Sequence, residues 1–465
     1  MNDERRRDNS GTRRPWRRGL CLLLILLLTV TAPTLPLLPI RAAVEEPPQT
    51  TDVGAVLVIN LENNLTLYEK SSDTTIYPSS SVKIMAGLLA CRALEDRLTE
   101  EVTVTAAMLS GVEGRRMNPP LADGEVLTVR DLLYAAVCGG YNDATQVVAC
   151  LSSGSVASFV EDMNREARRL GTIHTRYTNP TGLHDPAMAT SARDVSVIAR
   201  QAYRDELYME ISSVRTHTIP ATNVTPARSF TNRNALLSDS SLNYYNGYCR
   251  GMNAGMTDEG GWCVVTVCER NGASNLCIIL RGLDVASGEL IPAYVQTNRL
   301  LSWANRNYGY RTVLAAGETL DTVRVGMTGI SKSKADLVPA EDLKIYLPAD
   351  LDVEGQLEYS FLLDGGELTA PVTAGQTVGT VTVSHGGRIV GKAPLTVTED
   401  FKRSGFLDAL SLFRGYLTGR AFLLTVPIFL VMLLPYLYAT GSSGGRYGLR
   451  TVRRRRRIRY TKRHF

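Results

Sequence analysis

Hydrophobic and polar positions divide most of the chain into strand-like, then helix-like, then strand-like segments. Residues 54–70 contain two apolar runs around the turn-forming Glu62-Asn63-Asn64 and predict two strands. Apolar positions at helical spacing predict a helix that begins near Ser80 and further helices in residues 128–138, 142–151, 156–171 and 191–206. Residues 260–270 and 275–283 are rich in β-branched residues and predict adjacent buried strands. This order indicates an α/β (α+β layered) domain over residues 44–310, in which helices cover a sheet.

One of these helices has its ends marked by local sequence signals. Thr128 and Asp131 have the spacing of a capping box, in which a hydroxyl accepts from a backbone N–H three residues later. Gly139 and Gly140 then end the apolar periodicity. The next helix, in residues 142–151, is predicted to begin after a short loop.

The C-terminal third of the chain has a different pattern. Residues 311–400 show short alternating runs and little helical periodicity, which predicts a separate small β-sandwich domain. Residues 401–420 are predicted to be a linker or a helix at a membrane surface. Residues 421–440 carry no charge and are long enough to cross a bilayer. The tail of residues 441–465 contains ten Lys or Arg and no acid, which predicts a cytoplasmic flank of a transmembrane helix.

The N-terminus also resembles a targeting segment. Residues 1–18 carry seven Arg and three acids, and the apolar run GLCLLLILLLTVTAP follows. This pattern predicts an export signal, or an anchor that is not cleaved, in residues 1–43. Because the basic tail favours the cytoplasmic side, residues 44–404 are predicted to lie outside the cell membrane.

Charge and cysteine content exclude two classes of function. The chain has a net charge of +5, but its two ends carry +4 and +10, so the middle is acidic and no nucleic-acid partner is expected. The predicted exported part has seven cysteines, an odd number, and their spacing is not that of a metal site. No metal, no cofactor and no required disulfide framework are therefore expected, although one pair of cysteines could form a bond.

The segment Pro78-Ser79-Ser80-Ser81-Val82-Lys83 is the first candidate for chemistry. Ser80 and Lys83 are three residues apart, so a helix here would place both side chains on one face. A lysine in that position could take a proton from the serine. The alternative is structural, because Pro and Ser are ordinary residues at the start of a helix.

Two further segments give this serine a context. The loop GGYNDAT places Asn142 just after one predicted helix, and GMNAGMTDEGGW places Gly255 just before a predicted strand. In this order the chain resembles the low-molecular-mass penicillin-binding proteins, the serine D-alanyl-D-alanine carboxypeptidases related to β-lactamases. Their signatures are Ser-x-x-Lys, Ser-x-Asn and Lys-Thr-Gly. The likeness covers about residues 50–400 and includes the segments FVEDMNREARRLG, YTNPTGL, SARDVSVIA and TNRNALL.

The resemblance implies a fold and a set of roles. The fold would be a β-lactamase/transpeptidase-like domain, with an antiparallel sheet covered by helices, followed by a small β domain. Ser80 would attack the carbonyl between two D-alanines of a peptidoglycan stem peptide, with Lys83 as base. Backbone N–H groups of Ser80 and Met256 would hold the oxyanion, and Asn142 would orient substrate and lysine. β-Lactams would be covalent inhibitors, and the enzyme would be membrane-bound through the C-terminal helix.

The second and third signatures are degenerate in this sequence. Gly140 stands where the second signature has its serine hydroxyl, while Asn253 and Ala254 replace the cation and the hydroxyl that bind the substrate carboxylate. Gly255 and Thr257 are retained. Arg250 could supply the missing charge, but an odd offset on a strand points its side chain to the opposite face.

Two hypotheses therefore remain open. The chain is either a D-Ala-D-Ala carboxypeptidase, with activity that could be weak, or a pseudoenzyme that binds peptidoglycan or a cell-wall partner. Other candidates have structural interpretations: His184 as a loop residue, Cys138 as a packed core residue, and a second Ser-x-x-Lys at Ser331 as part of a polar loop.

Overall fold

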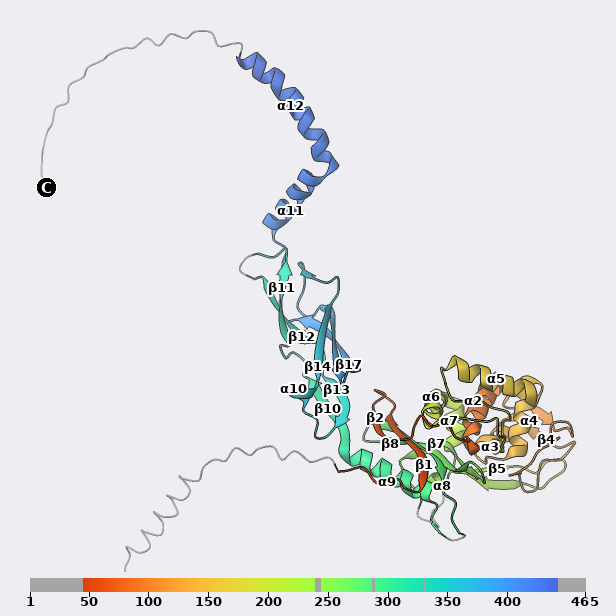
Figure 1. Ribbon diagram of the computed structural model, residues 1–465. Helices are drawn as coiled ribbons and strands as arrows, with labels where there is room; N and C mark the ends of the chain where they lie inside the picture. The colour runs from red at the N-terminus through yellow and green to blue at the C-terminus, as the bar shows by residue number, and fades with distance from the viewer. Residues whose placement is uncertain (1–44, 239–243, 287–288, 330–331, 442–465) are drawn as a thin grey trace, which may run out of the picture. The chain divides into compact units, whose positions relative to one another are not determined.

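The computed structural model describes residues 45–238, 244–286, 289–329 and 332–441 (Figure 1). The predicted signal or anchor in residues 1–43 lies outside the described residues, as does the basic tail beyond Gly441. The described chain forms two compact units. The first contains the described residues up to Gly309 together with Tyr346–Asp352, and the second contains Tyr310–Ile345 and the described residues from Val353 onward.

An antiparallel five-stranded sheet lies at the centre of the first unit. Its order is β2-β1-β9-β8-β7. The strands are β1 (Val53–Asn60), β2 (Thr66–Lys70), β7 (Cys249–Thr257), β8 (Gly261–Arg270) and β9 (Ala273–Gly282). The two predicted strand pairs, in residues 54–70 and 260–283, are confirmed. Strand β7 is at the edge of this sheet, so some of its backbone N–H groups are open to a ligand.

Helices cover both faces of the sheet (Figure 1). Residues Ala55 and Leu57 of β1 pack into the core on one face, whereas Val56 and Val58 pack into the core on the other. The first face is covered by α2 (Val82–Leu94), α3 (Val129–Val137), α4 (Asn142–Ser153), α5 (Val156–Arg169), α6 (Ala192–Tyr203) and α7 (Glu206–Ser213). The second is covered by α8 (Ala235–Ser238) and α9 (Pro292–Asn307). The predicted layered α/β (α+β) domain is confirmed.

Short elements complete the first unit. The turns η1 (Ser79–Ser81) and η2 (Glu95–Arg97) flank α2, β3 (Glu101–Thr103) pairs with β4 (Val126–Thr128), and β5 (Thr216–Ile219) pairs with β6 (Arg228–Thr231). The predicted capping box is also present. The Asp131 N–H donates to Thr128 Oγ1 at 3.1 Å, and Thr128 Oγ1 donates to Asp131 Oδ2 at 2.7 Å.

The second unit is rich in β structure, as the sequence predicts. Its six-stranded sheet has the order β14-β16-β17-β12-β11-β15. These strands are β11 (Asp321–Gly326), β12 (Lys334–Pro339), β14 (Glu358–Leu363), β15 (Leu368–Thr369), β16 (Thr377–His385) and β17 (Arg388–Val397), with the short helix α10 (Val353–Gln356) before β14. Two more strands, β10 (Tyr308–Leu314) and β13 (Leu343–Pro348), pair with each other, and each has residues assigned to both units.

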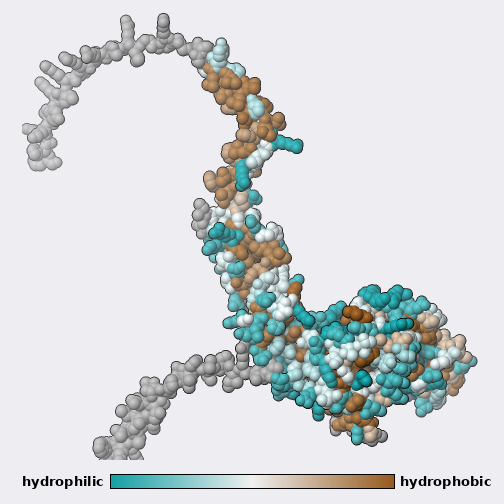
Figure 2. Space-filling model, viewed as in Figure 1, coloured by the Kyte–Doolittle hydropathy of each residue, from teal (hydrophilic) through white to brown (hydrophobic). Residues whose placement is uncertain are grey.

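Two helices follow the β-rich part. Helix α11 spans Gly405–Thr418 and α12 spans Arg420–Gly441. Apolar side chains cover α12 in Figure 2, and residues Arg420–Tyr438 are long and apolar enough to cross a membrane. None of that stretch is buried inside the protein. The predicted long apolar C-terminal helix is therefore present.

Candidate active site

The turn η1 contains three consecutive serines, and their contacts distinguish them. Ser79 Oγ donates to Gly261 O at 3.0 Å, and Ser81 Oγ donates to Pro78 O at 2.6 Å. Ser80 Oγ lies 3.5 Å from Cys263 Sγ, and Ser80 lines a cavity of about 490 Å³. Among the three, Ser80 is thus the serine whose side chain meets this cavity.

Gly255 of β7 lies directly against the Ser80 hydroxyl. A Cβ atom at position 255 would stand 2.2 Å from Ser80 Oγ, which is far inside van der Waals contact. Only glycine allows β7 and η1 to approach each other this closely. The absence of a side chain there brings an edge strand, with its backbone donors, next to Ser80.

Lys83 lines the same cavity as Ser80. Its side chain is buried, and its Nζ donates to Thr181 O at 2.6 Å. Burial lowers the pKa of Lys83 to about 7; Cys263 opposes this shift, and the positive charges of Arg233 and Arg115 add to it. Near neutral pH a large fraction of Lys83 is therefore a neutral amine, which can accept a proton.

Asn142 lines the same cavity from the first residue of α4. Its backbone N–H donates to Arg115 O at 2.7 Å, and its Nδ2 donates to Glu113 O at 2.8 Å. Its Oδ1 is buried and has no hydrogen-bond partner among the residues that the structure describes. The amide is therefore fixed in orientation and presents an acceptor that a substrate N–H could use.

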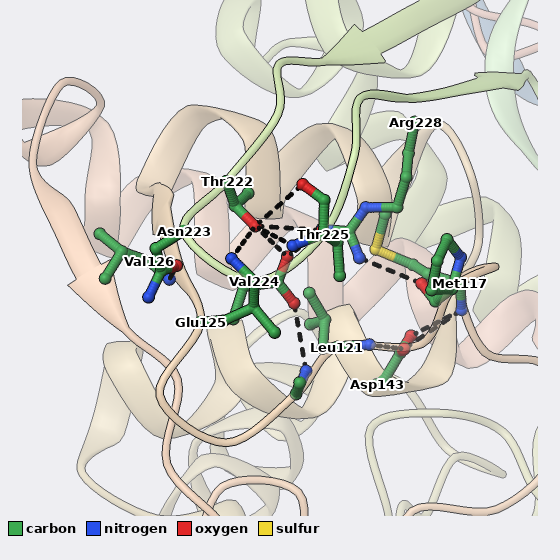
Figure 3. Close-up of polar contacts among 12 residues, drawn as sticks. Met117, Leu121, Glu125, Val126, Asp143, Thr222, Asn223, Val224, Thr225 and Arg228 are labelled. Carbon is green, nitrogen blue, oxygen red and sulfur yellow. Dashed lines mark hydrogen bonds and ion pairs between the residues drawn. The ribbon is translucent and has the colours of Figure 1, made fainter.

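The loop that carries Glu113 and Arg115 is held in place by buried carboxylates (Figure 3). Asp143 accepts from the Met117 N–H at 3.1 Å and from the Leu121 N–H at 3.2 Å. At the end of the loop, Glu125 forms an ion pair with Arg228 of β6 at 2.6 Å. Both side chains of that pair are almost fully buried, at 0% and 3% exposed. The loop is thereby fixed both to α4 and to the β5–β6 hairpin.

Gly140 has a backbone conformation that favours glycine. Its φ is +66°, and a Cβ atom there would stand 3.4 Å from Arg233 Cγ. A serine at this position would strain the backbone by about 1–2 kcal/mol, while its Cβ would make an ordinary van der Waals contact with Arg233. The missing hydroxyl of the second signature therefore coincides with a backbone conformation that favours glycine.

The residues of β7 do not all reach the cavity. Ala254, Gly255, Met256 and Thr257 line it, whereas Asn253 is not among its lining residues. Asn253 is 4% exposed, and its Oδ1 has no hydrogen-bond partner among the described residues. A bulge shifts the register of β7 just before Asn253, so the regular alternation of side chains is interrupted there.

Comparisons with known proteins identify the family. Residues 41–282, more than half of the chain, match the family described as D-alanyl-D-alanine carboxypeptidase. The chain belongs to this family. Residues 308–403 also match the C-terminal domain of penicillin-binding protein 5. The sequence is 25% identical to the D-alanyl-D-alanine carboxypeptidase DacF of Bacillus subtilis, over 77% of this chain and 88% of the relative. It is 28% identical to DacA of Haemophilus influenzae, over 78% and 88%.

Solved structures of other proteins are similar in fold. Penicillin-binding protein 5 of Haemophilus influenzae is 26% identical, with a TM-score of 0.57, over 77% of this chain and 100% of that one. A peptidoglycan synthesis regulatory factor of Streptococcus pneumoniae has the same fold, with a TM-score of 0.59, 18% identity, and coverage of 75% and 99%. The resemblance inferred from the sequence signatures is confirmed at the level of family and fold.

Sequence reasoning missed several residues of the carboxypeptidase-family cavity. Arg115 and Arg233 both line it, and His184, interpreted above as a loop residue, lines it too. Arg233 belongs to TNRNALL, one of the segments that carried the resemblance, so a signal for it was present. The other missed lining residues are Glu113, Gly114, Thr181, Leu183, Asp258 and Glu259.

Arg250 and Cys138, also considered in the sequence, do not line the cavity. Arg250 forms an ion pair with Glu269 at 3.4 Å on an exposed surface. Cys138 is buried, and burial raises the pKa of its thiol to about 12, which makes it a packed core residue. Ser331 lies outside the described residues. Within the described ranges, no group of three or more His, Cys, Asp or Glu is placed to hold a metal ion, and the seven described cysteines are free.

Proposed function

We propose that this protein is a serine D-Ala-D-Ala carboxypeptidase that removes the terminal D-alanine from peptidoglycan stem peptides. The observation that carries the proposal is the buried Lys83, whose pKa is lowered to about 7, in one cavity with the Ser80 hydroxyl. A serine hydroxyl becomes a useful nucleophile when a neighbouring neutral base takes its proton. Family membership supplies the substrate class.

The proposed reaction proceeds through an acyl-enzyme. Lys83 Nζ takes the proton of Ser80 Oγ while Oγ attacks the carbonyl carbon between the two D-alanines. The backbone N–H groups of Ser80 and Met256 hold the oxyanion. The proton passes to the amide nitrogen, the C–N bond breaks, and D-alanine leaves. Water then hydrolyses the ester, with Lys83 as base, and returns Ser80 to its starting state.

The retained groups supply positioning as well as chemistry. Thr181 O accepts one N–H of the Lys83 amine and so directs the amine within the cavity. Asn142 Oδ1, which has no partner among the described residues, accepts an N–H of the bound peptide. Gly255 keeps β7 close enough for its backbone donors to reach the oxyanion.

The alternative is a pseudoenzyme that binds peptidoglycan or a cell-wall partner. It is favoured by Gly140, Asn253 and Ala254, which lack the hydroxyl groups and the cation of the family signatures. Removing one preorganised donor from an active site costs about 2.7–4 kcal/mol of transition-state stabilisation. A low turnover rate is therefore compatible with the proposed function, whereas a complete lack of acylation is not.

The proposed function predicts covalent labelling of the full-length protein by a fluorescent penicillin. Mass spectrometry of the labelled peptide should place the adduct on Ser80, and Ser80→Ala should remove it while the melting temperature stays close to that of the natural protein. D-alanine should also be released from a peptide ending in D-Ala-D-Ala. An absence of label at millimolar penicillin would favour the pseudoenzyme, and label that persists in Ser80→Ala would assign the nucleophile to another residue.

The C-terminal helix supports a proposal about location. We propose that α12 crosses the cell membrane, because it is apolar along its length and is followed in the sequence by ten Lys or Arg without an acid. Helix α11 exposes large apolar side chains, including Phe406, Leu412 and Phe413, and would lie in the membrane interface.

The membrane proposal predicts the result of a protease test on sealed cells. Protease added outside should digest residues 44–404 and leave residues 441–465 intact, because the basic tail is expected on the cytoplasmic side. An antibody against residues 44–404 and a tag at the C-terminus report the two outcomes separately. Loss of the C-terminal tag from sealed cells would contradict this orientation.

A further inference from the structure

Two arginines line the cavity, and within the described residues neither forms an ion pair with an acid. Arg115 Nε donates to Gly139 O at 3.3 Å, and its guanidinium carbon lies 4.7 Å from the centroid of the Tyr141 ring. The guanidinium carbon of Arg233 lies 5.3 Å from the centroid of the Trp262 ring. An arginine stacked on an aromatic face keeps the N–H donors of its edge available to an anion.

The Arg233 guanidinium lies close to Ser80, and Arg115 lines the same cavity. The Cβ position of Gly255 that would stand 2.2 Å from Ser80 Oγ is also 3.8 Å from Arg233 Nε. Desolvation and the charge of Arg233 lower the pKa of Arg115, so the two cations repel each other across the cavity. Two like charges that face one cavity are stabilised when an anion binds between them.

The unpartnered acceptor of Asn142 is an independent sign that this cavity binds a ligand. Asn142 is 3% exposed, it lines the same cavity, and its Oδ1 makes no hydrogen bond within the described part of the chain. A buried polar atom without a partner is costly, so a ligand donor at that atom would stabilise the site. The cavity therefore offers an acceptor for an amide N–H and cations for a carboxylate.

We propose that Arg115 and Arg233 together bind the C-terminal carboxylate of the peptide, in place of the cation and hydroxyl that Asn253 and Ala254 do not supply. This inference rests on the proposed function, because it assumes that Ser80 attacks a peptide with a free C-terminal carboxylate. In such a peptide only one nitrogen and one Cα atom separate the attacked carbonyl from the carboxylate. The carboxylate therefore lies near Ser80, and guanidinium groups can bind it with two parallel hydrogen bonds each.

Arg115 is the specificity-determining residue that can be tested most directly, since its side chain is exposed at the edge of the cavity and its loss should not disturb the core. Its neighbour Arg116 provides a matched control. Arg116 is also exposed, but it does not line the cavity and donates instead to Val112 O. Arg115→Gln and Arg116→Gln each remove one positive charge from adjacent positions. Only Arg115→Gln removes a charge from the cavity.

The experiment compares two peptides with the full-length protein, one ending in D-Ala-D-Ala and one ending in D-Ala-D-alaninamide. The natural protein should favour the free carboxylate. Arg115→Gln should lower kcat/KM for the carboxylate peptide by about 10- to 150-fold, the usual effect of losing a hydrogen bond to a charged group, and should leave kcat/KM for the amide nearly unchanged. Arg116→Gln should retain the preference. An Arg115→Gln protein that keeps the full preference would overturn the inference and leave the proposed function intact.

Peptide binding to Ser80→Ala protein tests the same inference without turnover. Calorimetry should show tighter binding of the carboxylate peptide than of the amide, and Arg115→Gln in this background should remove most of that difference. Equal affinity for the two peptides in the Ser80→Ala protein would contradict the inference. If the protein binds in this way but never forms an acyl-enzyme, the carboxylate site stands and the proposed enzymatic function is wrong.

Discussion

Lys83→Met should lower the rate at which fluorescent penicillin acylates Ser80 by about 10²- to 10⁴-fold, the usual contribution of a general base. In the natural protein this rate should increase tenfold per pH unit below pH 7 and level off above it. The reason is that only the neutral amine accepts the serine proton, and burial lowers the pKa of Lys83 to about 7. Stopped-flow or quenched labelling from pH 5 to pH 9 measures both effects.

The same substitution should stabilise the protein in acid. Below pH 7 Lys83 is charged in the folded and unfolded states, so the folded state carries the full cost of burying the charge. As the pH rises from 7 toward the ordinary lysine pKa of 10.5, the folded state loses the proton first and this cost disappears. The melting temperature of Lys83→Met should therefore exceed that of the natural protein most clearly near pH 6.

A control separates these effects from a general loss of positive charge. Lys332 is exposed and pairs with Glu399 in the second unit, so Lys332→Met should leave the acylation rate and its pH dependence unchanged. If Lys83→Met is acylated as fast as the natural protein, or if the rate of the natural protein is independent of pH, Lys83 is not the base.

Features that depend on neighbours in the sequence were predicted well. The capping box of α3 joins Thr128 and Asp131, three residues apart, and the turn at Glu62–Asn64 joins two consecutive strands. Strands β8 and β9 are buried on both faces, which explains their nearly continuous apolar sequence. The residues in such interactions are close together in the sequence, so their pattern can be recognised in one sequence without an alignment.

The third signature shows where a sequence pattern is insufficient. Regular alternation would place Met252 and Ala254 on one face of β7, but they pack into the two different cores. The bulge between Arg250 and Asn253 causes this change of face. The amino-acid types in the segment do not predict a bulge there. Asn253 is not among the residues that line the cavity, so its role in substrate binding stays a prediction.

The sequence could not show that Arg115 and Arg233 share one cavity, because the two residues come from loops far apart in the chain. Arg115 reaches the cavity because its loop is fixed by hydrogen bonds to Asn142 and Asp143. Arg233 is held at the cavity because its backbone N–H donates to Cys138 O at 2.9 Å and its guanidinium lies over the Trp262 ring. The sequence shows the loss of a cation at position 253, but only the fold shows which cations stand near the same serine.

Glu125→Ala should destabilise the first unit by about 3–5 kcal/mol, which is the usual cost of removing one partner from a buried ion pair. Glu125 accepts from Arg228 Nη2 at 2.6 Å, from Thr225 Oγ1 at 2.7 Å and from Thr222 Oγ1 at 2.9 Å (Figure 3). The substitution would leave the Arg228 charge buried with no counter-ion. Chemical denaturation at pH 7, monitored by tryptophan fluorescence, measures the loss.

A double variant separates the lost charge pair from the lost packing. Glu125→Leu with Arg228→Met removes both charges and should be more stable than Glu125→Ala alone, because no buried charge is left unpaired. Equal stability of the two would mean that the hydroxyl and backbone contacts, and not the ion pair, hold the loop. Glu125→Ala should also slow acylation of Ser80 in the fraction that remains folded, since the loop that ends at Glu125 carries Arg115 and binds Asn142 through its carbonyl groups. A stable variant with unchanged acylation would show that the loop keeps its position without this pair.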